Sequence, residues 1–224
     1  VSADGVPHIV WADGRHGAYE IYHAVKNGSS WTRTRLTDHQ GGAQYPVVAV
    51  DAAGDAHVAW EDRRLVPGTS KVFYKRQLAG VWQADQQLTF QELTDAREPA
   101  IAVDAAGDVH IAWNDRRADF GDLYYRRCAS GVWQPEEPLQ ALSTTARNPA
   151  IACDLRGQAH LVWADNTPGM YSVYYTVHNT IGWSMLVGRS SCPNNPRAQS
   201  PVRGSYIWVV VASENSHALT PVSQ

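Results

Sequence analysis

Short runs of apolar and β-branched residues, separated by polar turns, recur along the whole chain. In the clearest stretch these runs are Ala100–Val103, Val109–Trp113 and Leu123–Arg127, and a fourth begins at Val132. The segment Asp104–Gly107 between the first two runs has the composition of a tight turn, with a glycine available for a positive φ. Helical periodicity is almost absent, so the pattern predicts four consecutive antiparallel strands, here called strands a to d.

The four-run pattern repeats, and two series of tryptophans set its register. The first series, with spacings of 49, 53 and 50 residues, is Trp11, Trp60, Trp113 and Trp163. The second series, with spacings of 51, 51 and 50 residues, is Trp31, Trp82, Trp133 and Trp183. The repeats span approximately 1–45, 46–98, 99–148 and 149–200, with a partial fifth at 201–224. Periods of this size are typical of solenoids, propellers and arrays.

A four-stranded antiparallel unit repeated in this way predicts an all-β propeller, with four nearly complete blades and a partial fifth in a single domain, 1–224. A β-sandwich is the alternative, but it has no reason to repeat one sheet. Strand b, for example His110–Trp113, lacks strict alternation, which suits a strand covered on both faces. An open ring would leave strand edges unpaired, so we expect either adjacent chain ends or self-association through the incomplete blade.

The amino-acid composition limits the classes of molecule that the protein is expected to bind. Only 18% of the residues are charged and the net charge is −3, which does not favour nucleic acid or an anionic membrane as a partner. No apolar run is long enough to span a bilayer. The first residues lack the basic and then apolar segments of a signal peptide. A secreted or cell-surface bacterial location is nevertheless favoured. The three cysteines do not form a metal-binding cluster, and the sequence implies no metal and no cofactor.

Histidine recurs at one position of every repeat, as His8, His57, His110 and His160. Metal ligands must converge on one point, whereas equivalent residues of different blades are distributed around a ring. These histidines are therefore predicted to be buried and hydrogen-bonded within their blades.

The chain resembles the sialidase-like (BNR, Asp-box) β-propeller superfamily. The resemblance lies in a D-x-x-G-x-x-H-h-x-W strand pair at Asp51–Trp60, Asp104–Trp113 and Asp154–Trp163. The c–d turns keep the tryptophan of an Asp box but lack its aspartate. In addition, Arg97-Glu98-Pro99 and Arg147-Asn148-Pro149 look like the R-I-P motif, whose arginine helps to bind the substrate carboxylate in sialidases. Some c–d strand pairs are also similar to those of propeller lectins.

In an antiparallel meander the b–c and d–a loops share one face of the disc, and here that face collects the charged residues. The candidate ligand-binding residues on it are Tyr45, Asp62, Arg63, Arg97, Asp115, Arg116, Arg147 and Arg197. Two arginine forks, Arg97 and Arg147, are expected to be neighbours that could clamp an acidic sugar. The alternative is that each arginine pairs with a repeated aspartate such as Asp62 or Asp115 and holds the blades together.

Three functions remain open from the sequence. The preferred one is a non-catalytic module that binds a glycan, as a lectin does, or a protein. A sialidase-like glycoside hydrolase is the second, but glycoside hydrolysis normally needs two placed carboxylates and the sequence does not single out a pair. The third is a structural or assembly propeller.

Overall fold

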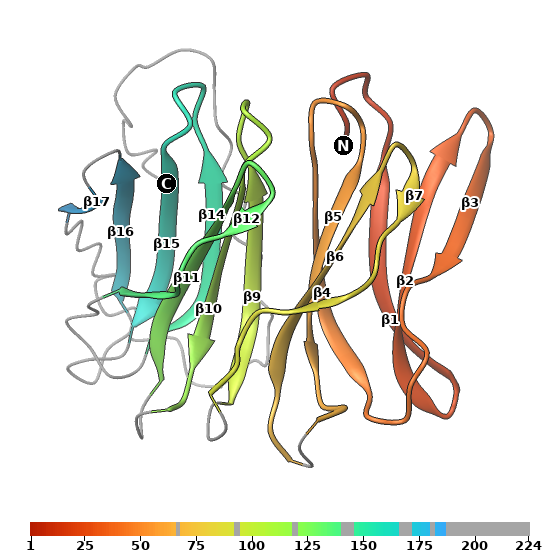
Figure 1. Ribbon diagram of the computed structural model, residues 1–224, viewed down its shortest axis with the longest axis horizontal. Coiled ribbons are helices and arrows are strands. Elements are labelled where there is room, and N and C mark those ends of the chain that lie inside the picture. Colours follow the sequence, from red (N-terminus) through yellow and green to blue (C-terminus); the bar gives the residue numbers. More distant parts are fainter. Residues whose placement is uncertain are drawn as a thin grey trace, which may run out of the picture.

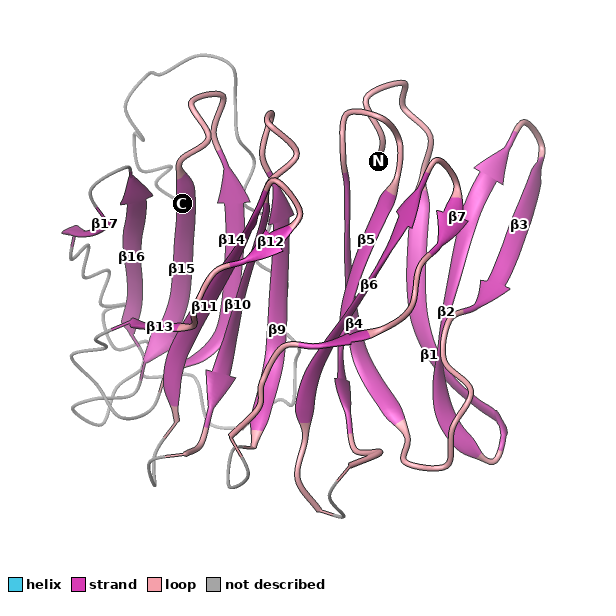
Figure 2. Cartoon of the chain, in the orientation of Figure 1, coloured by secondary structure: helices cyan, strands magenta, loops and turns pink. Residues whose placement is uncertain are grey.

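The computed structural model describes residues 1–65, 68–91, 95–117, 121–139, 146–165, 172–179 and 182–186. The regular elements of these residues are all β-strands, which form four antiparallel sheets standing side by side (Figure 1, Figure 2). None of the described segments is a helix that could cross a membrane. The chain has the all-β propeller fold that the sequence predicts, with one sheet for each blade.

The strands of each sheet follow one another in the chain. The first sheet consists of β1 (His8–His16), β2 (Ala18–Asn27) and β3 (Ser30–Arg35). The second consists of β4 (Ala43–Val50), β5 (Ala56–Asp62), β6 (Lys71–Leu78), β7 (Val81–Trp82) and β8 (Gln86–Gln87). The third consists of β9 (Ala96–Val103), β10 (Val109–Asp115), β11 (Asp122–Ala129), β12 (Val132–Trp133) and β13 (Glu137–Leu139). The fourth consists of β14 (Arg147–Cys153), β15 (Ala159–Asp165), β16 (Ser172–Asn179) and β17 (Gly182–Leu186).

In sheets two to four the chain order a, b, c, d is also the spatial order. The a strands β4, β9 and β14 contact one another in sequence and form the inner side of the assembly. In the second and third sheets strand d is split into two short pieces that pair with the same c strand, β7 and β8 with β6, and β12 and β13 with β11. The predicted partial fifth blade, 201–224, lies outside the described residues.

The hydrophobic core lies between the sheets. One cluster joins the first and second sheets, a second joins the second and third, and a third joins the third and fourth. Each cluster contains the strand-b tryptophan of its later sheet, namely Trp60, Trp113 and Trp163. All residues of β5 and β10 are buried, so a central strand is covered on both faces as predicted. The blades are therefore held together by apolar contact between successive sheets.

Two of the four repeated histidines, His57 and His110, are buried and hydrogen-bonded within their blades as predicted, whereas His8 and His160 are half-buried. His57 Nδ1 lies 2.6 Å from the Tyr74 hydroxyl, and its Nε2 lies 3.3 Å from Asp51 Oδ2. His110 repeats both contacts in the next sheet, at 2.7 and 3.4 Å. Burial lowers the pKa of both imidazoles, which favours their neutral form. Each histidine thus ties a turn to strand c of its own blade.

The c–d turns, which lack the aspartate of an Asp box, are anchored from the neighbouring a–b turn. Asp55 accepts hydrogen bonds from the backbone N–H groups of Ala79 and Gly80, each at 2.8 Å. Asp108 accepts one from Ser130 N–H at 2.9 Å. Ala79 and Ser130 have φ values of 50° and 49°, so these bonds hold turn residues in the left-handed region.

The first sheet differs from the others at its inner edge. Its innermost described strand, β1, corresponds in sequence to strand b, and no described strand pairs with its other edge. Ile9 is 47% exposed, whereas its counterparts Val58, Ile111 and Leu161 are each 0% exposed. An edge that no described strand covers, beside an exposed isoleucine, is the kind of surface on which a strand of another chain pairs.

We therefore expect the protein to self-associate as its concentration rises, and Ile9→Lys to weaken that association because an edge lysine opposes pairing. Multi-angle light scattering over a range of concentrations measures it. Val132→Lys is the matched control, since Val132 is 64% exposed on another sheet. A parent protein that stays monomeric, or a control as disruptive as Ile9→Lys, would contradict this expectation.

Candidate functional site

A central channel of about 490 Å³ runs between the inner strands. It is lined by three residues from each of β1, β4, β9 and β14, namely His8–Val10, Pro46–Val48, Pro99–Ile101 and Pro149–Ile151. Except for His8, these side chains are apolar. The three prolines stand near the start of the a strands, so they mark the end of the channel that opens on the d–a and b–c loops. This end is here called the channel mouth.

The residue before each of these prolines has an unusual backbone. Tyr45, Glu98 and Asn148 have φ values of 52°, 53° and 50°, which is the left-handed region that non-glycine residues avoid. The pairing register of the a strand with strand b shifts at the same place in all three sheets. Each a strand therefore carries a bulge at the channel mouth. Such strain, of order 1–3 kcal/mol per residue, persists only where the surroundings enforce it.

Hydrogen bonds between blades enforce two of these bulges. Glu61, the last residue but one of β5, accepts a bond from Glu98 N–H at 2.8 Å. Glu98 in turn accepts one from Asn148 N–H at 2.7 Å through Oε2. Each strained N–H is thus bonded to a carboxylate of the preceding blade. These links join the starts of β9 and β14 at the channel mouth.

Glu61 is the buried acid of this arrangement, at 3% exposure. Burial raises the pKa of its carboxyl group, and the nearby Glu98 charge acts in the same direction. The bond from Glu98 N–H and the charge of Arg97 oppose the rise in pKa. One Glu61 oxygen already accepts the hydrogen bond from Glu98 N–H, so Glu61 has a structural role at the channel mouth.

Asp62 and Asp115, which the sequence placed among the ligand-binding candidates, are both 0% exposed. Asp62 accepts hydrogen bonds from Trp60 Nε1 at 2.8 Å and from the Arg64 guanidinium at 2.6 Å. Asp115 binds Trp113 Nε1 and Arg117 in the same way, at 3.3 and 2.7 Å. A buried carboxylate with these partners cannot meet a ligand at the surface, so we correct both residues to a structural role.

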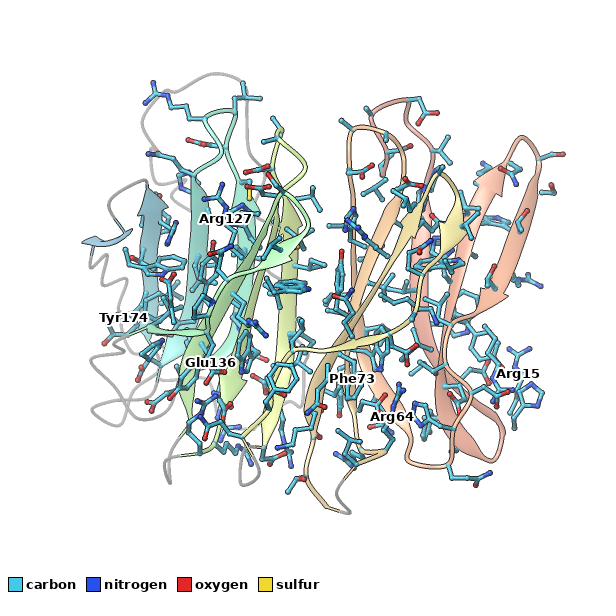
Figure 3. The ribbon with its side chains drawn as sticks, in the orientation of Figure 1. Arg15, Arg64, Phe73, Arg127, Glu136 and Tyr174 are labelled. Carbon is cyan, nitrogen blue, oxygen red and sulfur yellow. The ribbon has the colours of Figure 1, made fainter. Side chains whose placement is uncertain are left out.

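The arginines that pair with these aspartates are not the predicted ones. Arg64 also binds Asp85 at 2.5 Å and lies over the Phe73 ring, 4.4 Å from its centroid (Figure 3). Arg117 also binds Glu136 at 2.5 Å and lies 3.7 Å from the centroid of the Tyr124 ring. Arg64 and Arg117 are therefore built into their blades.

The remaining described candidates stand at the start of strand a or directly after strand b. Tyr45 is 61% exposed, and Arg63, Arg116 and Arg147 are exposed as well. Arg97 is half-buried and forms an ion pair with Asp95 at 2.7 Å. Its partner is thus neither Asp62 nor Asp115. Arg197 lies outside the described residues.

Sequence reasoning did not select Glu61, Glu98 or Asn148 as site residues. A signal was present, because Ala-x-x-Pro begins strand a in three repeats and its third residue varies: Tyr45, Glu98 and Asn148. Glu61 occupies another variable position, where the next repeats have Asn114 and Ala164. The backbone strain and the links between blades become visible only in the structure.

Neither a known protein family nor a curated protein matches the sequence, but solved structures share the fold. A protein of unknown function from Dyadobacter fermentans aligns with 82% of this chain and 51% of its own, at 13% identity and a TM-score of 0.61. The alpha-L-arabinanase of Penicillium chrysogenum, solved with arabinobiose, aligns with 82% of this chain and 60% of its own, at 12% identity and a TM-score of 0.56.

A third similar structure is the intramolecular trans-sialidase of Ruminococcus gnavus. It aligns with 79% of this chain and 41% of its own, at 10% identity and a TM-score of 0.50. The chain thus spans between two fifths and three fifths of the length of these three proteins. At such identities the likeness shows the fold alone, which is that of a β-propeller.

Proposed function

We propose that this propeller binds a carbohydrate at the channel mouth without cleaving it. The proposal rests on three positions where the backbone is the same in successive repeats but the side chain differs. Tyr45, Glu98 and Asn148 share one position of the repeat and one strained backbone, yet they present an aromatic ring, a carboxylate and an amide. The repeat thus offers three different side chains at equivalent places around the channel mouth.

These side chains have the chemistry of a sugar site. The planar groups of Glu98 and Asn148 can exchange hydrogen bonds with hydroxyl groups, and the exposed Tyr45 ring can pack against the apolar face of a sugar. The prolines of the channel provide an apolar floor. Small-molecule sites in general combine a mostly apolar lining with a few polar groups that set orientation.

The two-arginine clamp is not retained in this proposal, because Arg97 already pairs with Asp95. The exposed Arg63, Arg116 and Arg147 are proposed as flanking contacts. Non-catalytic binding is favoured because glycoside hydrolysis normally needs two placed carboxylates and Glu61, the carboxylate next to Glu98, is buried. Two propellers of similar fold, the arabinanase and the trans-sialidase, act on carbohydrates, which supports this ligand class.

A glycan array should therefore show binding, and Tyr45→Ala should reduce the affinity for the best glycan by about thirtyfold or more, as expected for an anchor worth at least about 2 kcal/mol. Isothermal titration calorimetry gives the affinity. Tyr19→Ala is the matched control, because Tyr19 is 50% exposed on β2 of the first sheet.

A fluorogenic sialoside assay accompanies the array. Turnover of the sialoside would overturn the non-catalytic part of the proposal. An array without any binding, or a Tyr45→Ala variant that binds as the parent does, would overturn the site itself.

A further inference from the structure

A second hollow of about 480 Å³ lies between the third and fourth sheets, at the end of the molecule opposite the channel mouth. Its polar lining comes from Asp104, Arg127, Arg156, Gln158 and His178. Figure 3 shows Arg127 near this end of the sheets, whereas Arg64 lies near the other end. The hollow is here called the 3–4 cleft, and it shares no residue with the channel mouth.

Two arginines and a histidine supply donors to the 3–4 cleft. Arg127 binds Asp108 Oδ2 through Nε at 3.1 Å and Nη2 at 2.5 Å, which orients its guanidinium and leaves further N–H groups available. Arg156 is exposed on the a–b turn of the fourth sheet. The His178 ring is held against Tyr125, with centroids 5.1 Å apart, and against Trp183, at 4.9 Å. Arg127 and His178 are therefore positioned by contacts within the fold, whereas the side chain of Arg156 is exposed at the edge of the cleft.

The acidic groups near the cleft are already engaged. Asp104 Oδ1 accepts hydrogen bonds from Ala106 N–H and Asp108 N–H, each at 2.9 Å, and its Oδ2 faces His110 Nε2 at 3.4 Å. Glu137, which is 46% exposed, lies 3.8 Å from His178 Nε2. Asp104 thus has hydrogen-bond partners for both oxygens within its own sheet, although its Oδ2 also lies beside Gly157 of the fourth sheet. Arg127 and Arg156 both line the hollow.

The preceding cleft, between the second and third sheets, is an internal reference with the same scaffold. At the positions of Arg156, Gln158 and His178 it has the residues Ala106, Asp108 and Cys128. The first change adds a positive charge, the second removes a negative one, and the third adds an imidazole. Since the same blade folds with either set, the fold does not require the cationic set.

We propose that the 3–4 cleft binds an oxyanion, a carboxylate or sulfate group, with Arg127 and Arg156 as the principal donors. A guanidinium matches such a group because its N–H donors are fixed in one plane and can bond two oxygens at once. Gln158 and His178 contribute further polar contacts. Leu155, at 82% exposure on the same turn, offers an apolar surface to the rest of the molecule that carries the anion.

The test is a titration of the whole chain with sodium sulfate, with sodium chloride replacing it to keep the ionic strength constant. We expect saturable binding that shifts the NMR signals of the His178 imidazole. These signals are assigned by their loss in the variant His178→Gln. Arg156→Ala, which restores the residue of the preceding cleft, should lower the affinity roughly 10- to 100-fold, as for the loss of a charge-assisted contact. Arg33→Ala is the control, because Arg33 is exposed on β3 far from the cleft.

Gln158→Asp, which restores the carboxylate of the preceding cleft, should also weaken sulfate binding. A parallel titration with acetate compares a planar carboxylate with the tetrahedral sulfate. A titration with glucuronate compares a carboxylate carried by a sugar with the free carboxylate of acetate. Sulfate binding that is unaffected by both Arg156→Ala and Gln158→Asp, or that is weakened equally by Arg33→Ala, would overturn the proposal. So would the absence of saturable binding by any of these anions. Tyr45→Ala should leave sulfate affinity unchanged, so this site and the channel mouth are tested separately.

Discussion

Replacing Trp113 by alanine is expected to lower the free energy of unfolding by about 3–5 kcal/mol, the usual result of truncating a fully buried aromatic residue. Trp113 is 0% exposed and packs in the cluster between the second and third sheets. Its Nε1 also donates to Asp115, so the substitution removes a partner of a buried carboxylate as well. Trp60→Ala should behave alike, because Trp60 has the same place between the first and second sheets.

Thermal unfolding measures the effect. For a chain of this size about 1 kcal/mol corresponds to roughly 2–4 °C, so the melting temperature should fall by about 6–20 °C, or the variant should aggregate. Trp31→Ala is the control, because Trp31 is 38% exposed on the outer strand β3 and should cost much less. If Trp60→Ala and Trp113→Ala melted within a degree or two of the parent, the assignment of these tryptophans to the core would be wrong.

Asp62→Ala should also destabilise the protein, by about 1–3 kcal/mol, because it leaves buried donors without their acceptor. Arg64 keeps a second carboxylate partner, Asp85, so its charge stays compensated. Arg64 would lose both the bond to its guanidinium and the bond from its backbone N–H, at 2.6 and 2.9 Å. Trp60 Nε1 would lose its acceptor too. Asp62→Asn should be less damaging, since its amide oxygen can still accept one of these bonds.

Asp38→Ala is the matched control for this prediction. Asp38 also pairs with an arginine, Arg35, at 2.7 Å, but its side chain is 83% exposed, so the pair should contribute about 1 kcal/mol or less. Chemical denaturation of the parent and the three variants gives the free energies. Equal effects of Asp62→Ala and Asp38→Ala would show that Asp62 does not have the structural role assigned here and would return it to the candidate ligand-binding residues.

Part of the candidate site could be predicted from the sequence. The meander placed Tyr45, Arg63, Arg116 and Arg147 on one face because alternate loops of antiparallel strands must share an end. The same reasoning also selected Asp62 and Asp115, since it assigns a loop to a face but does not distinguish its buried residues from its exposed ones. The prediction therefore identified the surface but did not separate the buried structural residues from the residues that are exposed to a ligand.

The amino-acid sequence by itself determined the architecture. The chain alternates between strand and turn residues, and two tryptophan series keep this alternation in register. The pattern is local and is present in every repeat. Strand pairing between neighbours in the chain follows from it, because each strand is joined to the next by a short turn. That the central strands β5 and β10 are covered on both faces was also predictable, because their residues do not alternate strictly between apolar and polar.

Only the tertiary structure decided which residues cooperate between blades. The bond from Glu98 N–H to Glu61 joins residues 37 apart in the chain, and the bond from Asn148 N–H to Glu98 joins residues 50 apart. These distant partners support the left-handed backbone of Glu98 and Asn148, although Tyr45 has the same backbone, and no local pattern predicts which residues they bond. The 3–4 cleft has the same origin, since Arg127 and Arg156 belong to different repeats and line one hollow only once their sheets are packed together.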